Sequence, residues 1–323
     1  MQFPQGSAGL QLPAAIMSTA NPMRYPTLQF CRRTFGTLLL FLAATPTSGD
    51  SSFLANAVPQ NLNDFYQGLK DRVASCQHSL AGGFYSIDDG TNTTSYCTND
   101  PHRPSIIYLS GGNGTLSNMD VDCDGVQSGS QDDGRCSLGR SPDYQDATAF
   151  RDLIQSFKVG ISDLNTYVHP YVVFGNSGSK PGWRTFDPTD YGVRPLSVMA
   201  VVCPGNKLVY GIWGDTNGDD GDNPMVGEVS IALATACWGK NMTGDSGYDG
   251  MDVLYVAFTG EDAVPGKDGA DWAAKDYDSF ERSIQPLGEK LVQRMRGVAV
   301  GRKAISLWAV AGGALAGGLW LAS

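Results

Sequence analysis

Several residue patterns that common enzyme classes need are absent from this sequence of 323 residues. It has only three histidines and no Cys-x-x-Cys pair, which argues against a zinc site. No Gly-x-Ser-x-Gly elbow lies near a histidine, which argues against a Ser-His-Asp hydrolase. There is no phosphate-binding Gly-x-x-x-x-Gly-Lys loop, and no dinucleotide-binding glycine pattern follows a predicted strand. The protein is therefore expected to work without a cofactor.

Positive charge is scarce as well. The chain has 23 Lys and Arg against 33 Asp and Glu, which gives a formal net charge of −10 at pH 7. Such a protein repels the phosphates of nucleic acids, so nucleic acid is excluded as a partner and a cationic partner is favoured. Hydrophobic residues make up 41% of the chain, which is enough for a folded core.

Residues 1–49 are predicted to be a leader that contains a signal peptide. Arg32 and Arg33 precede an apolar run over 35–44 that is too short to span a bilayer, and small residues follow this run. This order of charge, apolar run and small residues is typical of export. We expect the mature protein to be secreted, extracellular and monomeric.

A second apolar segment covers residues 304–322, directly after Arg302 and Lys303. Its length matches one membrane span, and a basic flank on the cytoplasmic side suits such a span. The alternative is a lipid-anchor signal that is cleaved. Both alternatives predict attachment to the membrane or cell surface rather than free secretion.

The cysteines outside the leader are even in number, which predicts up to three disulfides in an oxidising compartment. Fifteen pairings of six cysteines are possible, and the spacing alone does not choose among them. Glycosylation sequons at Asn92, Asn113 and Asn241 are compatible with the same compartment. The six cysteines are Cys76, Cys97, Cys123, Cys136, Cys203 and Cys237.

Residues 60–296 are predicted to form one domain of the β-rich α+β class. Helices are expected over 61–73 and 147–157 and from Asp278, where Glu281 would complete a capping pair. The turn at 204–206 predicts a hairpin between two strands. We expect a compact β-barrel, six-stranded and double-psi-like, with peripheral helices. The apolar runs typical of strands cover 83–87, 105–109, 169–174, 196–203, 207–213 and 251–258.

Carboxylates are crowded after the strand expected over 207–213. Each negative charge makes the next carboxyl harder to ionise, unless a cation binds between them. The cation is either a metal or a substrate that carries amines. The run Asp120-Val-Asp122-Cys-Asp124-Gly125 has the oxygen spacing of a calcium loop, but its twelfth position is Gln131 rather than Glu. We therefore expect no metal site.

Glycoside hydrolysis needs only two carboxyl groups, one protonated and one ionised. Asp215 and Glu228 lie 13 positions apart across a glycine-rich segment and could face each other over a groove. Tyr210 and Trp213 are close enough in sequence to stack on sugar rings, although each could equally be a core residue.

The chain resembles the secreted fungal endo-chitosanases of glycoside hydrolase family 75. The resemblance extends over about 60–296 and is carried by four blocks in the same order, which are Met119-Asp-Val-Asp-Cys-Asp-Gly125, Pro195-Leu-Ser-Val-Met-Ala-Val-Val-Cys203, Tyr210-Gly-Ile-Trp-Gly-Asp-Thr-Asn-Gly-Asp219 and Val226-Gly-Glu-Val-Ser-Ile-Ala-Leu233. It implies inverting, endo-acting hydrolysis of the β-1,4 linkages of chitosan, with Asp215 and Glu228 as the essential pair.

The expected roles follow from the neighbours of the two carboxyl groups. Glu228 lies between Val226 and Val229, where burial would raise its pKa, so it is assigned as the general acid. Asp215, expected in a polar turn, is assigned as the general base. A non-catalytic protein that binds cationic polysaccharide and a calcium-stabilised structural domain stay open as alternatives. Expected substrate-binding residues are Asp120, Asp122, Asp124, Tyr210, Trp213, Asn217, Asp219 and Asp222, with Asp220 beside them.

Overall fold

The computed structural model describes residues 55–71, 76–136 and 144–297. Two segments predicted from the sequence, the leader over 1–49 and the apolar segment over 304–322, lie outside these residues. The chain divides into the units Met1–Ser48 and Gly49–Ser323, and the fold below is that of the second unit. Within the described part of the chain, no helix is both long enough and apolar enough to cross a membrane.

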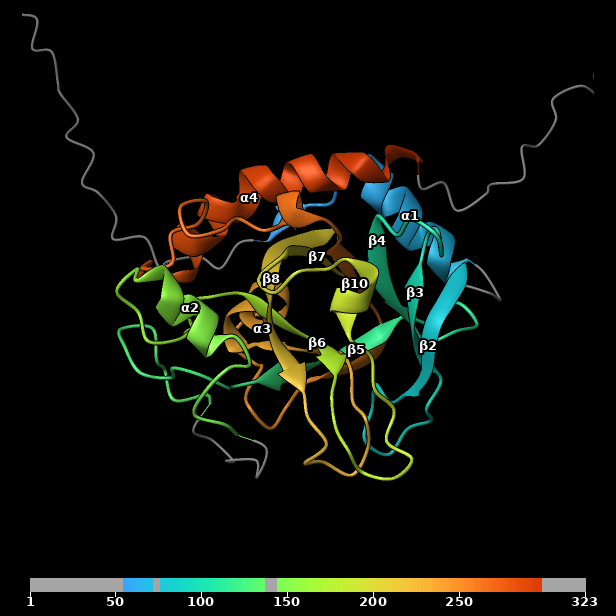
Figure 1. The fold of residues 1–323 in the computed structure, drawn as a ribbon, viewed down its shortest axis with the longest axis horizontal. Coiled ribbons are helices and arrows are strands. Elements are labelled where there is room, and N and C mark those ends of the chain that lie inside the picture. Colours follow the sequence, from blue (N-terminus) through green and yellow to red (C-terminus); the bar gives the residue numbers. More distant parts are fainter. Residues whose placement is uncertain (1–54, 72–75, 137–143, 298–323) are drawn as a thin grey trace, which may run out of the picture. The chain divides into compact units, whose positions relative to one another are not determined.

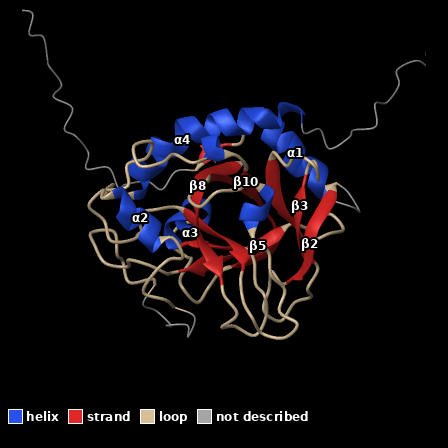
Figure 2. Cartoon of the chain, in the orientation of Figure 1, coloured by secondary structure: helices blue, strands red, loops and turns tan. Residues whose placement is uncertain are grey.

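Strands and helices alternate irregularly along the chain (Figures 1 and 2). The helices are α1 (Gln60–Lys70), α2 (Arg151–Phe157), α3 (Ile231–Trp238) and α4 (Tyr277–Gln293), with short 3-10 turns η1 (Pro188–Tyr191), η2 (Glu261–Ala263) and η3 (Arg294–Gly297). The strands are β1 (Asn56–Ala57), β2 (His78–Phe84), β3 (Thr94–Thr98), β4 (Ile106–Ser110), β5 (Ser117–Asp122), β6 (Tyr171–Asn176), β7 (Val198–Cys203), β8 (Lys207–Asn217), β9 (Glu228–Ser230) and β10 (Tyr248–Phe258).

All ten strands belong to one sheet with the order β1-β8-β6-β9-β5-β10-β4-β3-β2, and β7 pairs with both β10 and β8. These pairings close a ring of six strands, in the order β8, β6, β9, β5, β10 and β7. Strands β6 and β8 are parallel, as are β5 and β9, and the other pairs are antiparallel. The β-rich α+β class is confirmed, while the double-psi-like barrel stays a prediction.

Strand β7, most of β8 and the second half of β10 (253–258) are buried on both faces, which explains their nearly continuous apolar sequences. Successive side chains of a strand point to opposite faces. On β7, Val198, Ala200 and Val202 join a core cluster that also contains residues of α1 and α4. Met199 and Val201 join a second cluster, which contains much of α3. Helices α1 and α4 therefore cover one face of these strands (Figure 1).

The predicted hairpin is confirmed. Strands β7 and β8 are antiparallel neighbours joined across 204–206. Gly205 and Asn206 have positive φ angles of 86° and 62°, the conformation that tight hairpin turns need. Three other predicted strands agree with β4, β6 and β10 within a few residues. The strand expected over 83–87 is misplaced, because β2 ends at Phe84.

The helix ends differ from those predicted. The helix expected over 61–73 is α1, which begins at Gln60 after Pro59 and ends at Lys70, and its apolar residues Leu62, Phe65 and Leu69 are buried. In α4 the cap is Asp276, whose side chain accepts a hydrogen bond from the Ser279 N–H at 2.8 Å. Glu281 is not part of a capping pair. It is buried and accepts a hydrogen bond from Asn56 at 2.6 Å, and burial raises its pKa to about 7.

Three disulfides form, which confirms the prediction from the cysteine count. Cys76 pairs with Cys97, Cys123 with Cys136, and Cys203 with Cys237.

Helix α4 packs closely on β8 at Gly288. A Cβ atom at this position would lie 2.3 Å from a ring carbon of Tyr210, which is fully buried and cannot move aside. Alanine favours a helix over glycine by about 1 kcal/mol, but overpacking of a core costs about 1–3 kcal/mol. We expect Gly288→Ala to lower the free energy of unfolding by about 1–2 kcal/mol in urea denaturation. Glu289→Ala, on the exposed side of the same helix, should change it by less than about 0.5 kcal/mol, and equal effects would contradict this packing.

Candidate active site

A cavity with a volume of about 370 Å³ lies at the ends of β5, β8 and β9. Loops over 144–145, 218–225 and 244–247 complete its wall. Its charge is of one sign, because none of the described residues that line it is basic. The acidic residues of the wall are Asp88, Asp120, Asp122, Asp124, Asp215, Asp220, Asp245 and Glu228.

Glu228 is positioned by the short parallel pairing of β5 with β9, which places it beside Asp120. It is half-buried and lines the cavity. Helix α3 follows directly, with Ser230 as its cap, so Glu228 lies two residues before the cap and outside the first turn of the helix. Asp120 is held by the Asn118 amide, which donates to its Oδ2 at 2.7 Å.

Asp215 is buried, with 5% of its surface exposed. Its Oδ1 accepts hydrogen bonds from the N–H groups of Ala149 at 2.9 Å and Thr216 at 2.7 Å. Burial raises its pKa well above the ordinary value, and the negative charge of Asp122 adds to this effect. The prediction that Asp215 lies in a solvated turn is therefore wrong. Strand β8 continues to Asn217 and carries Asp215 into the buried end of the sheet.

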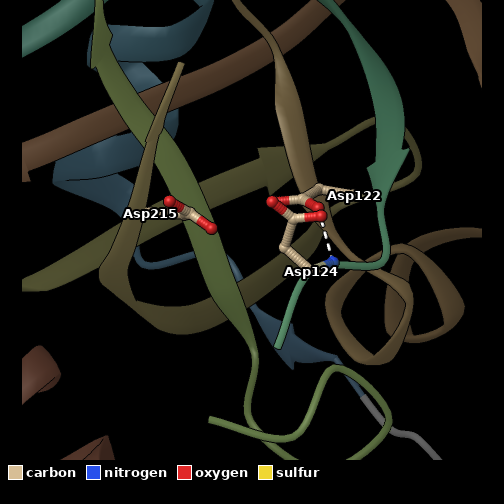
Figure 3. A group of neighbouring side chains, drawn as sticks. All are labelled: Asp122, Asp124 and Asp215. Carbon is tan, nitrogen blue, oxygen red and sulfur yellow. Dashed lines mark hydrogen bonds between the residues drawn. The ribbon is translucent and has the colours of Figure 1, made fainter. Parts of the chain in front are cut away.

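Asp122, Asp124 and Asp215 form a three-carboxylate cluster, in which one oxygen from each residue lies within 4.8 Å of the others. The three side chains face one another from β5, the segment after β5, and β8 (Figure 3). Burial is the main cause that raises the pKa of Asp122 to about 6 and that of Asp124 to about 9. The carboxyl groups of this cluster consequently hold protons more tightly than free aspartates do.

Other predicted residues divide between the cavity and its surroundings. Asn217 lines the cavity and donates a hydrogen bond to the Met225 carbonyl at 2.9 Å. Asp219 and Asp222 do not line it. The carboxylate of Asp219 instead accepts hydrogen bonds from backbone N–H groups, including that of Lys180 at 2.9 Å, so it fixes a neighbouring loop.

The prediction that Tyr210 and Trp213 stack on sugars is corrected. They are 1% and 2% exposed and do not line the cavity, because β8 is covered on both faces. Tyr210 packs against Gly288, and the Trp213 ring meets Phe150 edge to face. Trp213 still supports the site, since its ring N–H donates to the Asp215 carbonyl at 2.8 Å.

Sequence reasoning missed several residues of the wall, among them Asp88, Tyr144, Gln145 and Asp245. They come from three separate loops, and no local pattern marks them. Gln145 is linked directly to a predicted residue, because its N–H donates to Asp124 at 2.7 Å.

The acidic wall makes stability depend on pH. Burial raises the pKa of Asp120 from 3.8 to about 6, so the folded state holds this proton more tightly than the unfolded state does. The contribution of this proton to the free energy of unfolding is fully present below about pH 4 and is lost as the pH rises through about 6. We expect wild-type protein to lose roughly 2 kcal/mol more than Asp120→Asn between pH 4 and pH 8 in urea unfolding. Asp268→Asn, on the surface, should behave as wild type, and an unchanged slope in Asp120→Asn would contradict the assignment.

A cavity walled by carboxylates, with Asp215 and Glu228 both in its lining, is the kind of site that acid–base glycoside hydrolases use. Comparison with known proteins gives the same class of enzyme. Residues 119–294 match the family described as fungal chitosanase of glycosyl hydrolase group 75, and the chain belongs to this family of glycoside hydrolases.

Named relatives cover most of the chain. An endo-chitosanase of Aspergillus oryzae is 43% identical over 246 residues, which is 74% of this chain and 92% of that protein. An endo-chitosanase of Aspergillus fumigatus is 42% identical over 241 residues, with the same coverage. Endo-chitosanase C of Aspergillus oryzae is more distant, with 30% identity over 179 residues, or 55% of this chain and 38% of that protein.

Proposed function

We propose that this protein is an endo-chitosanase that hydrolyses the β-1,4 linkages between glucosamine units with inversion of configuration. The observation that carries the proposal is the cavity wall, with seven aspartates, one glutamate and no basic residue among its described lining. Glucosamine units carry ammonium groups below neutral pH, so this wall attracts the polymer and orients its amines. The family and the names of the relatives point the same way.

Glu228 is assigned as the general acid and Asp215 as the general base. Glu228 gives its proton to the leaving glycosidic oxygen while water attacks the anomeric carbon from the opposite face. The bond to the leaving sugar breaks, a bond to the water oxygen forms, and the water gives a proton to Asp215. This role suits Asp215, because backbone N–H groups hold its Oδ1 while its Oδ2 has no partner among the described residues.

The raised pKa of Asp215 opposes this role until substrate binds. After burial, the largest cause of the rise is the negative charge of Asp122. A substrate ammonium held by Asp122 and Asp124 offsets that charge and favours the ionised form of Asp215. In this mechanism the cationic substrate itself prepares the base.

The activity is tested on soluble chitosan by measuring the release of reducing ends and, by NMR, the first anomer formed. An inverting enzyme releases the α-anomer first. Binding of the polymer without release of reducing ends would instead support the alternative of a non-catalytic polysaccharide-binding protein. Early formation of the β-anomer would contradict inversion.

The two roles are separated with a chitobioside that carries a dinitrophenyl leaving group. Such a group departs without a proton, so Glu228→Gln should keep most of its activity on this substrate while losing it on the polymer. Asp215→Ala should be slow on both substrates and should be rescued by azide, which replaces the activated water. The reverse pattern would exchange the roles of the two residues.

Asp163 is proposed as a positioning residue for Asp215. It is buried, and its carboxylate accepts hydrogen bonds from the N–H and hydroxyl of Thr148 at 2.8 and 2.7 Å. This fixes the backbone at Ala149, whose N–H donates to Asp215.

We expect Asp163→Asn to lower kcat about tenfold with little change in KM, and to shift the pH profile of kcat, because Asp215 loses its fixed orientation. Thr148→Ser keeps the hydroxyl and should stay near wild type. A loss of activity that only follows the fraction of folded protein would contradict this role.

The more specific predictions of architecture and location are kept as proposals. The closed ring of six strands supports the double-psi-like barrel. Export by the segment 1–49 and attachment by the segment 304–322 are tested by fractionating cells with and without phospholipase. Release by phospholipase supports a lipid anchor, retention supports a membrane span, and protein in the medium alone rejects both. A monomer is expected in light scattering.

A further inference from the structure

The three-carboxylate cluster is built like a set of ligands. Each carboxyl group has one oxygen fixed by a backbone N–H. Asp122 Oδ1 accepts from the Asp124 N–H at 2.7 Å, Asp124 Oδ1 accepts from the Gln145 N–H at 2.7 Å, and Asp215 Oδ1 accepts from the Ala149 N–H at 2.9 Å. Their orientation is therefore set by the backbone at Asp124 and in the loop that contains Gln145 and Ala149, and it does not depend on a bound substrate.

One oxygen of the cluster lacks a partner. Asp215 Oδ2 is buried, and it makes no hydrogen bond within the described part of the chain. A buried polar atom without a partner destabilises the folded state, and such atoms are rare in native proteins. The Asp215 carboxyl group faces Asp122 and Asp124 (Figure 3), so a cation between the three would satisfy this oxygen.

We propose that Asp122, Asp124 and Asp215 bind a hard divalent cation of the Ca²⁺ type, which competes with the ammonium group of the substrate. Ca²⁺ takes six to eight oxygen ligands in flexible geometry. Three carboxylates supply part of this shell, and the cavity of about 370 Å³ has room for water to supply the rest. Zn²⁺ and Cu²⁺ fit poorly, because no histidine lines the described cavity and its cysteines, Cys123 and Cys136, are joined in a disulfide.

The proposed ligands differ from those of the calcium-loop pattern in the sequence. Asp120, the first residue of that pattern, lies beside Glu228 and accepts a hydrogen bond from the Asn118 side chain. The third carboxylate comes instead from β8, far away in the chain. This explains why the pattern, which lacks its final Glu, could not predict the site, and it departs from the expectation that no metal binds.

Competition with substrate follows from the place of the site. Asp215 is the proposed general base, so an ion bound to it prevents the attack of water. This second part of the proposal rests on the proposed function, whereas binding of the ion does not.

Binding is tested by titrating Ca²⁺ into the chelator-treated full-length protein at pH 7 in a calorimeter. We expect a dissociation constant of about 10⁻⁴–10⁻³ M, the range of extracellular calcium modules. Asp124→Asn should weaken binding at least tenfold. Asp88→Asn removes the same charge from the same cavity but outside the cluster, and it should weaken binding less than threefold.

Two results would overturn the site, namely no binding up to about 10 mM Ca²⁺, or equal weakening by Asp124→Asn and Asp88→Asn. If Asp124→Asn does not fold, Asp122→Asn replaces it in the same comparison. In kinetic assays, Ca²⁺ should raise KM for chitosan and leave kcat unchanged. Binding without this effect would reject competition and keep the ion site, and a protein inactive on chitosan would reject only the proposed function.

Discussion

Replacing Asp215 by Asn is expected to lower kcat on soluble chitosan by about 10²–10⁴-fold, the contribution of a general base. The amide keeps an oxygen for the N–H groups of Ala149 and Thr216 but cannot take a proton from water. Folding should persist, because the substitution removes a buried group whose pKa is already raised towards the neutral form. Initial rates of reducing-end release measure kcat, and a thermal melt of the same sample shows whether the variant is folded.

Glu228→Gln should cause a loss of the same order on the polymer. Asp268→Asn removes one negative charge from an exposed position outside the cavity, so it controls for the change in net charge and should keep wild-type activity. If either Asp215→Asn or Glu228→Gln kept more than about one tenth of wild-type kcat, that residue would have no part in proton transfer.

Removal of the disulfide between Cys203 and Cys237 is the second large effect that we expect. The two residues are 34 positions apart, are fully buried, and connect the end of β7 to α3. A loop of this length restricts the unfolded chain by about 4 kcal/mol in the chain-entropy model. The double variant Cys203→Ala and Cys237→Ala should therefore lose about 3–4 kcal/mol of unfolding free energy in guanidinium chloride.

The disulfide between Cys123 and Cys136 provides the comparison. It closes a loop of 13 positions, for which the chain-entropy model gives a stabilisation of about 3 kcal/mol. Both of its cysteines line the cavity, so its removal should also reduce activity, whereas the Cys203 and Cys237 variant should stay active at temperatures where it remains folded. Greater stability loss from the shorter loop would contradict the entropic argument.

The sequence predicts much of the scaffold because its signals are local. The apolar runs identify β4, β6, β7, β8 and β10, and the turn at 204–206 predicts how β7 and β8 pair. The pairing of the cysteines was not predictable, because Cys203 and Cys237 meet only after β7 and α3 have packed. The ring of strands depends on similar distant contacts, such as that of β5 with β9.

The sequence predicted several residues of the active site, but it did not predict how buried their side chains are. Asp122, Asp124, Asp215 and Glu228 all line the cavity, as expected of the acidic segments. The prediction that Asp215 lies in a solvated turn was wrong, because the glycine and aspartate composition suggested a turn where β8 in fact continues. Tyr210 has the composition of a sugar-binding aromatic, but α4 covers it, and nothing near Tyr210 in the sequence indicates that contact.

The position of Cys123 between Asp122 and Asp124 has a practical consequence. Its bond to Cys136 constrains the backbone that carries both acids, so the disulfide helps to hold them in place. In protein made in a reducing bacterial cytosol, the segment between Cys123 and Cys136 would therefore be less constrained. Recombinant production calls for a periplasmic or yeast secretion host, and specific activity should be compared only between batches with matched free-thiol content.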